Sequence, residues 1–219
     1  MAAVSVALGL LGGCGSGRSE AERTADLRAA QARQLAKDAG LPADVTAFLE
    51  TAARGVAATF TATYHVGDAT VVVAQRPPRR RVDTRRAGAP DHADVVTADA
   101  TYACDRDPRW SCRRTGPVAQ GAGAFNPELV TTVAQSLAAS RDAYSLRAEP
   151  REVAGVEADC LVASPRASDD TAAPGGAETL CVSPSGVPLL LAAAGGEALR
   201  ATAFRRGASD AALALPATP

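Results

Sequence analysis

Aromatic residues and histidine are scarce in this 219-residue chain, and net charge is almost absent. Phe, Trp and Tyr together supply 4% of the residues, His occurs twice, and the formal net charge is −1 at pH 7. The balanced charge gives no electrostatic case for nucleic acid as a partner, and so few histidines make a zinc site unconvincing. Because the hydrophobic fraction is still 47%, we expect a core built from Val, Leu and Ala.

The chain also lacks the motifs of common catalytic sites. It contains no G-x-S-x-G sequence, and neither His65 nor His92 is accompanied by a nucleophile and an orienting third group. Asp105 and Asp107 form an Asp-x-Asp pair, but the other ligand positions of an EF-hand calcium loop are missing. The sequence therefore predicts a protein that is not an enzyme and has no metal site or cofactor.

Long apolar runs are missing too, and the one near the N-terminus ends in a cysteine. Residues 2–11 are too few to span a bilayer, which takes about 20 apolar residues. They precede Leu11-Gly12-Gly13-Cys14, and this order is typical of a bacterial lipoprotein signal peptide and its cleavage site. We expect residues 1–14 to be a signal peptide and Cys14 to carry a diacylglyceryl anchor at the outer face of the cytoplasmic membrane. No Lys or Arg precedes Cys14, so the alternative is an ordinary apolar segment with a stray thiol.

The cysteine count fits this interpretation. Setting Cys14 aside, four of the five cysteines remain, and four allow three pairings. We expect the pairs Cys104–Cys112 and Cys160–Cys181, because each would tie neighbouring strands together. Disulfides indicate an oxidising compartment outside the cytoplasm, and each would stabilise the fold by roughly 2–4 kcal/mol.

Sequence periodicity predicts three helices. Residues 21–39 are rich in Ala and charged residues and are followed by Gly40, which predicts a helix whose thin apolar face holds Leu27 and Leu35 together with alanines. Residues 43–57 carry a single apolar stripe at helical spacing. The third helix is predicted over 126–141, because its opening Asn-Pro-Glu supplies a cap, a favoured first residue and a charge suited to the helix dipole.

Runs of β-branched and aromatic residues predict strands for most of the remaining chain. The predicted strands are 59–66, 69–75, 82–85, 95–102, a segment near Cys112, 152–163, 179–183, 187–193 and 198–204. Turn-forming residues at 87–94 and 165–176 predict loops. Residues 15–40 would be a tether and a first helix, and residues 41–219 a single domain.

Two stretches in the C-terminal half resemble a recurring pattern of actinobacterial lipoproteins. Residues 153–160 are V-A-G-V-E-A-D-C, and residues 180–190 are L-C-V-S-P-S-G-V-P-L-L. Together with Phe60-x-Ala62-x-Tyr64 and the later Arg76-Pro77-Pro78, they resemble the superfamily of LolA-like and LppX/LprG-like lipoproteins. The resemblance implies an α+β fold in which a strongly curved antiparallel sheet, a half-barrel, has helices on its concave face. It also implies non-enzymatic binding or transfer of a lipid or another apolar ligand.

A ligand cavity would lie between such a sheet and its helices. The expected lining residues are apolar side chains from two strands and from the third helix and its approach: Phe60, Tyr64, Val72, Phe125, Val133 and Leu137. The alternative is that these side chains pack to native density and leave no cavity. The chain would then be a protein-interaction or sensing module of the cell envelope.

Two surface features leave their roles open. Arginines cluster between Arg76 and Arg86, where they could meet anionic lipid headgroups at about 1 kcal/mol each or protect an edge strand from pairing; we favour the edge strand. Trp110 is the only tryptophan. It could contact a partner or a membrane, or it could pack over the first disulfide.

Overall fold

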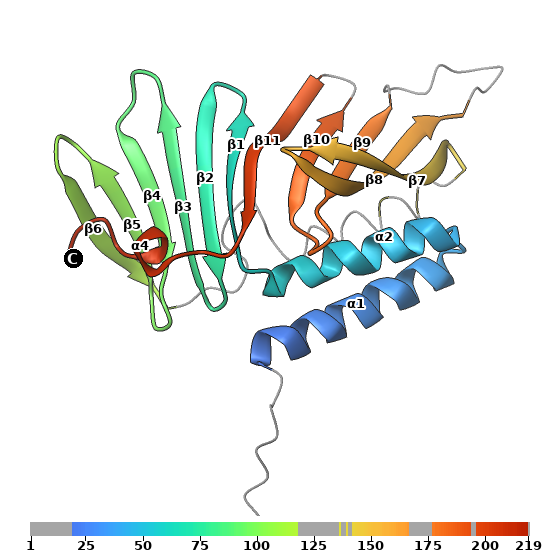
Figure 1. Ribbon diagram of the computed structural model, residues 1–219, viewed down its shortest axis with the longest axis horizontal. Coiled ribbons are helices and arrows are strands. Elements are labelled where there is room, and N and C mark those ends of the chain that lie inside the picture. The colour runs from blue at the N-terminus through green and yellow to red at the C-terminus, as the bar shows by residue number, and fades with distance from the viewer. Residues whose placement is uncertain are drawn as a thin grey trace, which may run out of the picture.

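The computed structural model describes residues 19–117, 136, 139, 142–166, 177–193 and 196–218. These residues form an α+β fold around one antiparallel sheet of eleven strands that does not close (Figure 1). The strands are β1 Phe60–Val66, β2 Ala69–Arg76, β3 Arg79–Arg86, β4 Asp91–Val96, β5 Thr101–Arg106, β6 Trp110–Gly116, β7 Tyr144–Val153, β8 Val156–Pro165, β9 Glu178–Val182, β10 Pro188–Ala193 and β11 Gly196–Arg206. Within the described ranges, no helix has the length and apolar character needed to cross a membrane.

The sheet consists of two meanders that meet in its middle. Its spatial order is β6-β5-β4-β3-β2-β1-β11-β10-β9-β8-β7, so each strand lies beside its neighbour in sequence except at the junction of β1 with β11. That junction pairs Phe60 with Arg206 and Tyr64 with Ala201. Strands β6 and β7 are consequently the two ends of the sheet (Figure 1).

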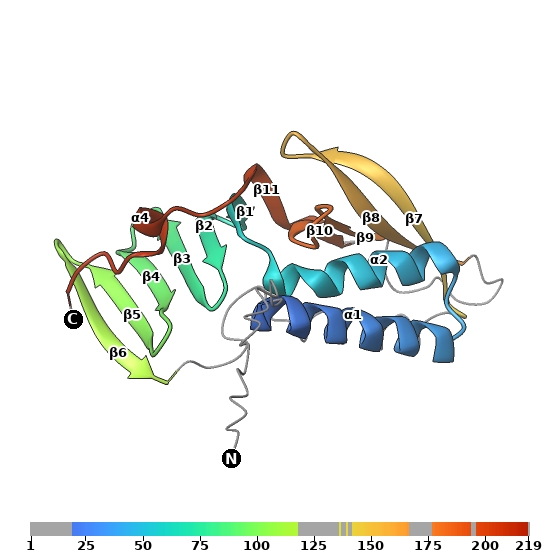
Figure 2. The ribbon, with the colours of Figure 1, turned by 60° about the horizontal axis from the view of Figure 1, so that its bottom comes forward.

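The first two predicted helices are confirmed as α1, Glu20–Asp38, and α2, Ala43–Arg54, which run side by side below the β7–β10 end of the sheet (Figure 2). Ser19 and Glu22 cap α1 reciprocally, which satisfies two backbone N–H groups at its start. The short 3-10 turn η1, Gly55–Ala57, follows α2 and completes the predicted 43–57 helix.

The expected alanines form the buried face of α1, but Leu27 does not join them, which corrects that part of the predicted apolar face. Leu27 is 73% exposed, and the buried residues of α1 are Ala25, Ala29, Ala32 and Ala36. Side chains this small allow two helix backbones to approach closely, so the Ala-rich composition serves the packing of α1 on α2. A pair of hydrogen bonds from Arg33 to Glu50 joins the two helices at their surface.

The register of the strands defines two faces of the sheet. Residues directly opposite each other on antiparallel strands point to the same face. Helices α1 and α2 form a buried cluster with Leu161 and Val182, and Leu161 lies opposite Leu180. We call this side the helix face and the other side the outer face. Followed strand by strand from β8 to β6, one row of the helix face holds Leu161, Leu180, Leu191, Leu199, Ala201, Tyr64, Val71, Thr84, His92, Asp105 and Ser111.

The segment 207–218 covers part of the outer face of the β2–β5 half. It contains the short helix α4, Asp210–Leu213, which lies against β2 and β3. Leu213 is buried, and Leu215 packs against a small cluster that includes Val95 and Cys104. This segment gives the outer face of that half an apolar cover of its own.

Three details of the predicted strands are wrong. The expected strand 95–102 is broken by a turn, because the Thr97 hydroxyl accepts hydrogen bonds from the backbone N–H groups of Asp99 and Ala100. The expected loop 87–94 is shorter, since β4 already begins at Asp91. The expected strand 152–163 is the second arm of a hairpin, and its first arm, β7, was missed because it is rich in charged residues and contains Pro150.

Both expected cysteine pairs lie at disulfide distance. The Sγ atoms are 2.12 Å apart in Cys104–Cys112 and 2.04 Å apart in Cys160–Cys181. Each pair occupies directly opposite positions on adjacent strands, β5 with β6 and β8 with β9. The prediction that each bond ties neighbouring strands is therefore confirmed.

Candidate functional site

The candidate site is the helix face of the sheet, and its apolar part centres on β1. Phe60 and Tyr64 lie two pleats apart on this face and are 2% and 0% exposed. The Phe60 ring stacks on Phe204 of β11 with ring centroids 6.2 Å apart. The Tyr64 hydroxyl donates a hydrogen bond of 3.0 Å to the backbone carbonyl of Pro188, and burial raises the pKa of this phenol. Two of the expected lining residues are thus buried on the same face of β1.

Val72 does not join this surface, which corrects its predicted role. It lies opposite Thr63 of β1 and Asp83 of β3, so its side chain belongs to the outer face. A strand alternates its side chains between faces, and the Val71-Val72-Val73 run hid that alternation in the sequence. Val71, opposite Tyr64, and Val73, opposite Ala62, occupy the helix face instead.

The remaining three expected lining residues, Phe125, Val133 and Leu137, lie outside the residues that the structure describes. So does the predicted helix 126–141, apart from Ser136 and Ala139, which are both helical.

The apolar floor extends from β1 to β3 and toward β11. Its members are small or β-branched side chains in one buried cluster: Ala62, Val73, Val82 and Ala201, with Val71 and Leu199 packed against them. No charged side chain interrupts this set. The surface is therefore chemically suited to acyl chains or another apolar group.

The end of α2 is fixed to this surface by two contacts. Gln75 of β2 is 9% exposed, and its side-chain amide donates hydrogen bonds to the backbone carbonyls of Gly55, Val56 and Ala58. These carbonyls include groups that the end of a helix leaves without partners. Gly186, in the turn between β9 and β10, packs its backbone directly on Gly55. The helix pair is therefore held rigidly at the β1–β2 side of the site.

Toward β4 and β5 the same face becomes polar. The Nδ1 atom of His92 lies 2.7 Å from a carboxylate oxygen of Asp105, and its Nε2 atom lies 3.4 Å from Asp94. The hydrogen bond with Asp105 is the main cause that raises the pKa of His92, and Asp94 adds to it. Burial lowers the pKa of the Arg80 guanidinium on the adjacent strand, and the nearby Asp94 offsets part of that effect. The helix face is thus apolar around β1 and ionic at β4 and β5.

Sequence reasoning considered His92 only with Asp91 and Asp94 and missed Asp105 as its closest partner. Asp105 is separated from His92 by a strand turn, and only the β4–β5 register brings the two together. Asp91 instead lies 3.5 Å from Arg106 and on the opposite face from His92. His65 lies on the outer face of β1, opposite Thr70 and Arg200. Among the described residues, no group of three or more His, Cys, Asp or Glu side chains is arranged to hold a metal ion.

The arginine cluster is divided between the two faces and largely paired. Arg76 and Arg79 both contact Asp210, and Arg86 lies 2.8 Å from Asp68. Arg81 donates to Asp83 and to the backbone carbonyl of Ala214. Strand β3 is also an inner strand of the sheet, flanked by β2 and β4, so the edge-strand interpretation is wrong.

Trp110 opens β6 and packs into the small cluster on the outer face. Its neighbours there are Tyr102, Cys112 and Leu215. Of the two roles left open, packing beside the disulfide is therefore the one that the contacts support.

A shallow hollow of about 260 Å³ lies on the β7–β8 hairpin. Pro150, Arg151, Glu152 and Glu157 line it. Three of these side chains are charged, so this hollow is chemically unsuited to an apolar ligand.

Comparison of the chain with protein-family models and with curated proteins finds no match. The resemblance to LolA-like and LppX/LprG-like lipoproteins therefore stays a prediction from the sequence pattern.

Proposed function

We propose that this protein is an extracytoplasmic lipoprotein, anchored through Cys14 at the outer face of the cytoplasmic membrane, that binds a lipid or another apolar ligand without catalysing a reaction. In this proposal the open sheet is a half-barrel with α1 and α2 on its concave side. The ligand lies against the helix face. Its apolar part contacts the β1–β3 floor, next to the end of α2.

The observation that carries the proposal is the continuous apolar surface on the helix face. Ala62, Val73, Val82 and Ala201 lie on four adjacent strands, belong to one buried cluster and have the register of the helix face. The open sheet supports it, because a sheet that does not close leaves room beside its inner face. The two disulfides support the proposed compartment, since such bonds persist outside the cytoplasm.

Native mass spectrometry tests this function directly. The chain from Gly15 onward lacks the anchoring cysteine, so any bound lipid is non-covalent. We expect an acyl lipid to co-purify from a lipid-containing host and to be released on denaturation. A clean ligand-free mass from repeated preparations would overturn the proposal and favour a protein-interaction module of the cell envelope.

Two neighbouring valines supply a matched pair of variants. Val71 and Val72 are adjacent, β-branched and half-buried, but they point to opposite faces of β2. Val71→Asn places an amide in the apolar floor and should reduce the fraction of lipid-bound protein, whereas Val72→Asn should leave that fraction unchanged. Equal occupancy in both variants would contradict the helix face as the binding surface.

A further inference from the structure

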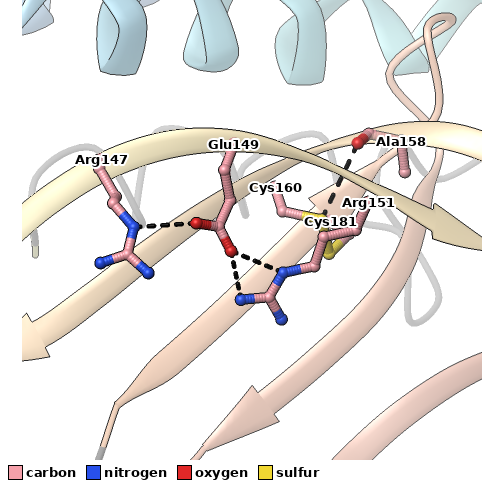
Figure 3. Close-up of polar contacts among 6 residues, drawn as sticks. All are labelled: Arg147, Glu149, Arg151, Ala158, Cys160 and Cys181. Atoms are coloured by element: carbon pink, nitrogen blue, oxygen red, sulfur yellow. Dashed lines mark hydrogen bonds and ion pairs between the residues drawn. A yellow bond between two sulfur atoms is a disulfide. The ribbon is translucent and has the colours of Figure 1, made fainter.

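The two ends of the sheet differ in how they are protected against pairing with another strand. At one end, β7 contains Pro150, which cannot donate a backbone hydrogen bond. Glu149 accepts hydrogen bonds from Arg147 at 2.9 Å and from Arg151 Nε at 2.7 Å, beside the Cys160–Cys181 disulfide (Figure 3). A proline and charged side chains are among the usual devices that discourage strand addition at an edge, and on β7 the charges include both signs.

At the other end, β6 has no proline, and its exposed charges are all basic, so they discourage pairing with a neutral or basic strand but not with an acidic one. Its sequence, Trp110 to Gly116, contains no proline and no acidic residue. Arg113 and Arg114 are exposed, and neither forms an ion pair with any residue in the described ranges. The Cys104–Cys112 disulfide links the strand to β5 and so keeps the β6 backbone in the extended conformation that strand pairing requires. An edge strand of this kind is a template for pairing with another extended chain.

The two arginines make both sides of this edge basic. Arg113 lies opposite Ala103 and Arg114 opposite Tyr102, so they point to the helix face and the outer face respectively. Two acids of the adjacent strands are already engaged, because Asp105 contacts His92 at 2.7 Å and Asp91 lies 3.5 Å from Arg106. An added strand with two consecutive acidic residues would meet one arginine on each face.

We propose that β6 binds an extended acidic segment of a partner protein, which adds to the sheet as a further strand. Backbone hydrogen bonds to the β6 edge supply general affinity, and the ion pairs with Arg113 and Arg114 select acidic sequences. This inference is independent of the ligand proposed for the helix face.

Charge also argues against two other occupants of the edge. Self-pairing of β6 from two copies would gather four arginines along one short ladder, and like charges on facing strands are destabilising. The chain's own stretch 118–135 contains a single acidic residue, Glu128. Neither a second copy of β6 nor the stretch 118–135 supplies two adjacent acidic residues to pair with Arg113 and Arg114.

A fluorescence titration with the full chain tests the proposal, because Trp110 is the only tryptophan and begins β6. The probe is a short peptide in which Thr and Val alternate around a central Asp-Glu pair. We expect a saturable change in Trp110 emission. Replacing both arginines, Arg113→Ser with Arg114→Ser, should weaken binding about tenfold, since two cross-strand ion pairs are lost.

The control variant is Arg85→Ser, which removes an arginine that is likewise exposed but belongs to the inner strand β3, and it should leave binding unchanged. A peptide with Lys-Lys at its centre should not bind. Hydrogen exchange with the acidic peptide should protect β6 amides and leave those of β7 unprotected. Undiminished binding by the double variant, protection at β7, or sedimentation showing a dimer that protects β6 would each overturn the proposal.

Discussion

At the residue scale, a close backbone contact joins Gly55 at the end of α2 to Gly186 in the β9–β10 turn. A Cβ atom on Gly186 would lie 2.2 Å from the carbonyl oxygen of Thr51, and one on Gly55 would lie 2.3 Å from the carbonyl oxygen of Gly186. Gly186 also has a φ of +79°, a conformation that residues with a side chain rarely adopt. The turn expected from Pro184-Ser185-Gly186 is therefore also a docking point for the helix pair.

We predict that Gly186→Ala destabilises the protein far more than Gly155→Ala. Gly155 has a similar φ of +75°, but a Cβ there would meet nothing within 4 Å. The matched variant should thus lose only the backbone strain of about 1–2 kcal/mol. Gly186→Ala should lose roughly a further 1–3 kcal/mol through the clash with α2. Urea unfolding midpoints measure both, and equal midpoints would show that the glycine contact does not constrain the helix.

A second residue-scale prediction concerns the charge of His92. The pKa of His92 is raised above its ordinary value of 6.5, chiefly by its hydrogen bond to Asp105. A group with a raised pKa binds its proton more tightly in the folded state. Its stabilising contribution is therefore fully present below pH 6.5 and is lost as the pH rises through the raised pKa of the folded protein.

NMR titration in a His65→Gln background isolates the single remaining imidazole. We expect Asp105→Asn to lower the pKa of His92 clearly and Asp94→Asn to lower it less, because Asp105 is the larger cause. An unchanged pKa in Asp105→Asn would show that the 2.7 Å contact does not persist in solution.

Single residues also show where sequence reasoning stops. The aromatic positions Phe60 and Tyr64 could be predicted as inward-facing, because they alternate with Thr residues in a strand pattern. Val71, Val72 and Val73 could not be assigned to a face, because three identical side chains carry no alternation. Asp105 could not be matched with His92, because their contact depends on a register that local sequence does not encode.

At the element scale, each of the two disulfides joins a pair of adjacent antiparallel strands, but the two bonds differ in their exposure to solvent. Cys160 and Cys181 are both 0% exposed, whereas Cys112 is half-exposed beside the buried Cys104. Reduction proceeds by attack of a thiolate on an accessible sulfur. The edge strand therefore carries the accessible bond, and the buried bond lies at the other end of the sheet.

We predict that a low concentration of dithiothreitol reduces Cys104–Cys112 before Cys160–Cys181 in the folded protein. Alkylation of the freed thiols followed by mass spectrometry identifies the order. Complete reduction should then cost roughly 3 kcal/mol of stability per bond. Simultaneous reduction of both pairs would contradict the prediction, because it would mean that the chain unfolds globally before either bond is attacked.

Elements with strong local signals could be predicted, and elements without them could not. Helix α2 carries its stripe of Val45, Phe48, Leu49 and Ala52 in the sequence, and all four are buried. Strand β7 carries Arg147, Glu149, Arg151 and Glu152 around a proline, so it lacks the composition of a strand. It forms a strand because it pairs with β8 through the turn at Ala154 and Gly155, and not because of its own composition.

At the scale of the whole molecule, hairpin-by-hairpin connection explains why the fold class could be anticipated. Nine of the ten strand pairings in the sheet join strands that are neighbours in sequence, and the tenth is the seam between β1 and β11. The open sheet and the position of α1 and α2 agree with the α+β expectation. The seam itself has no local signature, because its partners come from opposite ends of the domain.

That seam has a consequence for synthesis. A ribosome releases β1 long before β11, and Thr61 waits for its hydrogen bond to Gly207 across a sequence separation of 146 residues. Until then β1 is a bare, apolar border in a half-assembled sheet, and long-range pairing of this kind is slow. The incompletely synthesised chain is therefore more prone to aggregation than the folded protein.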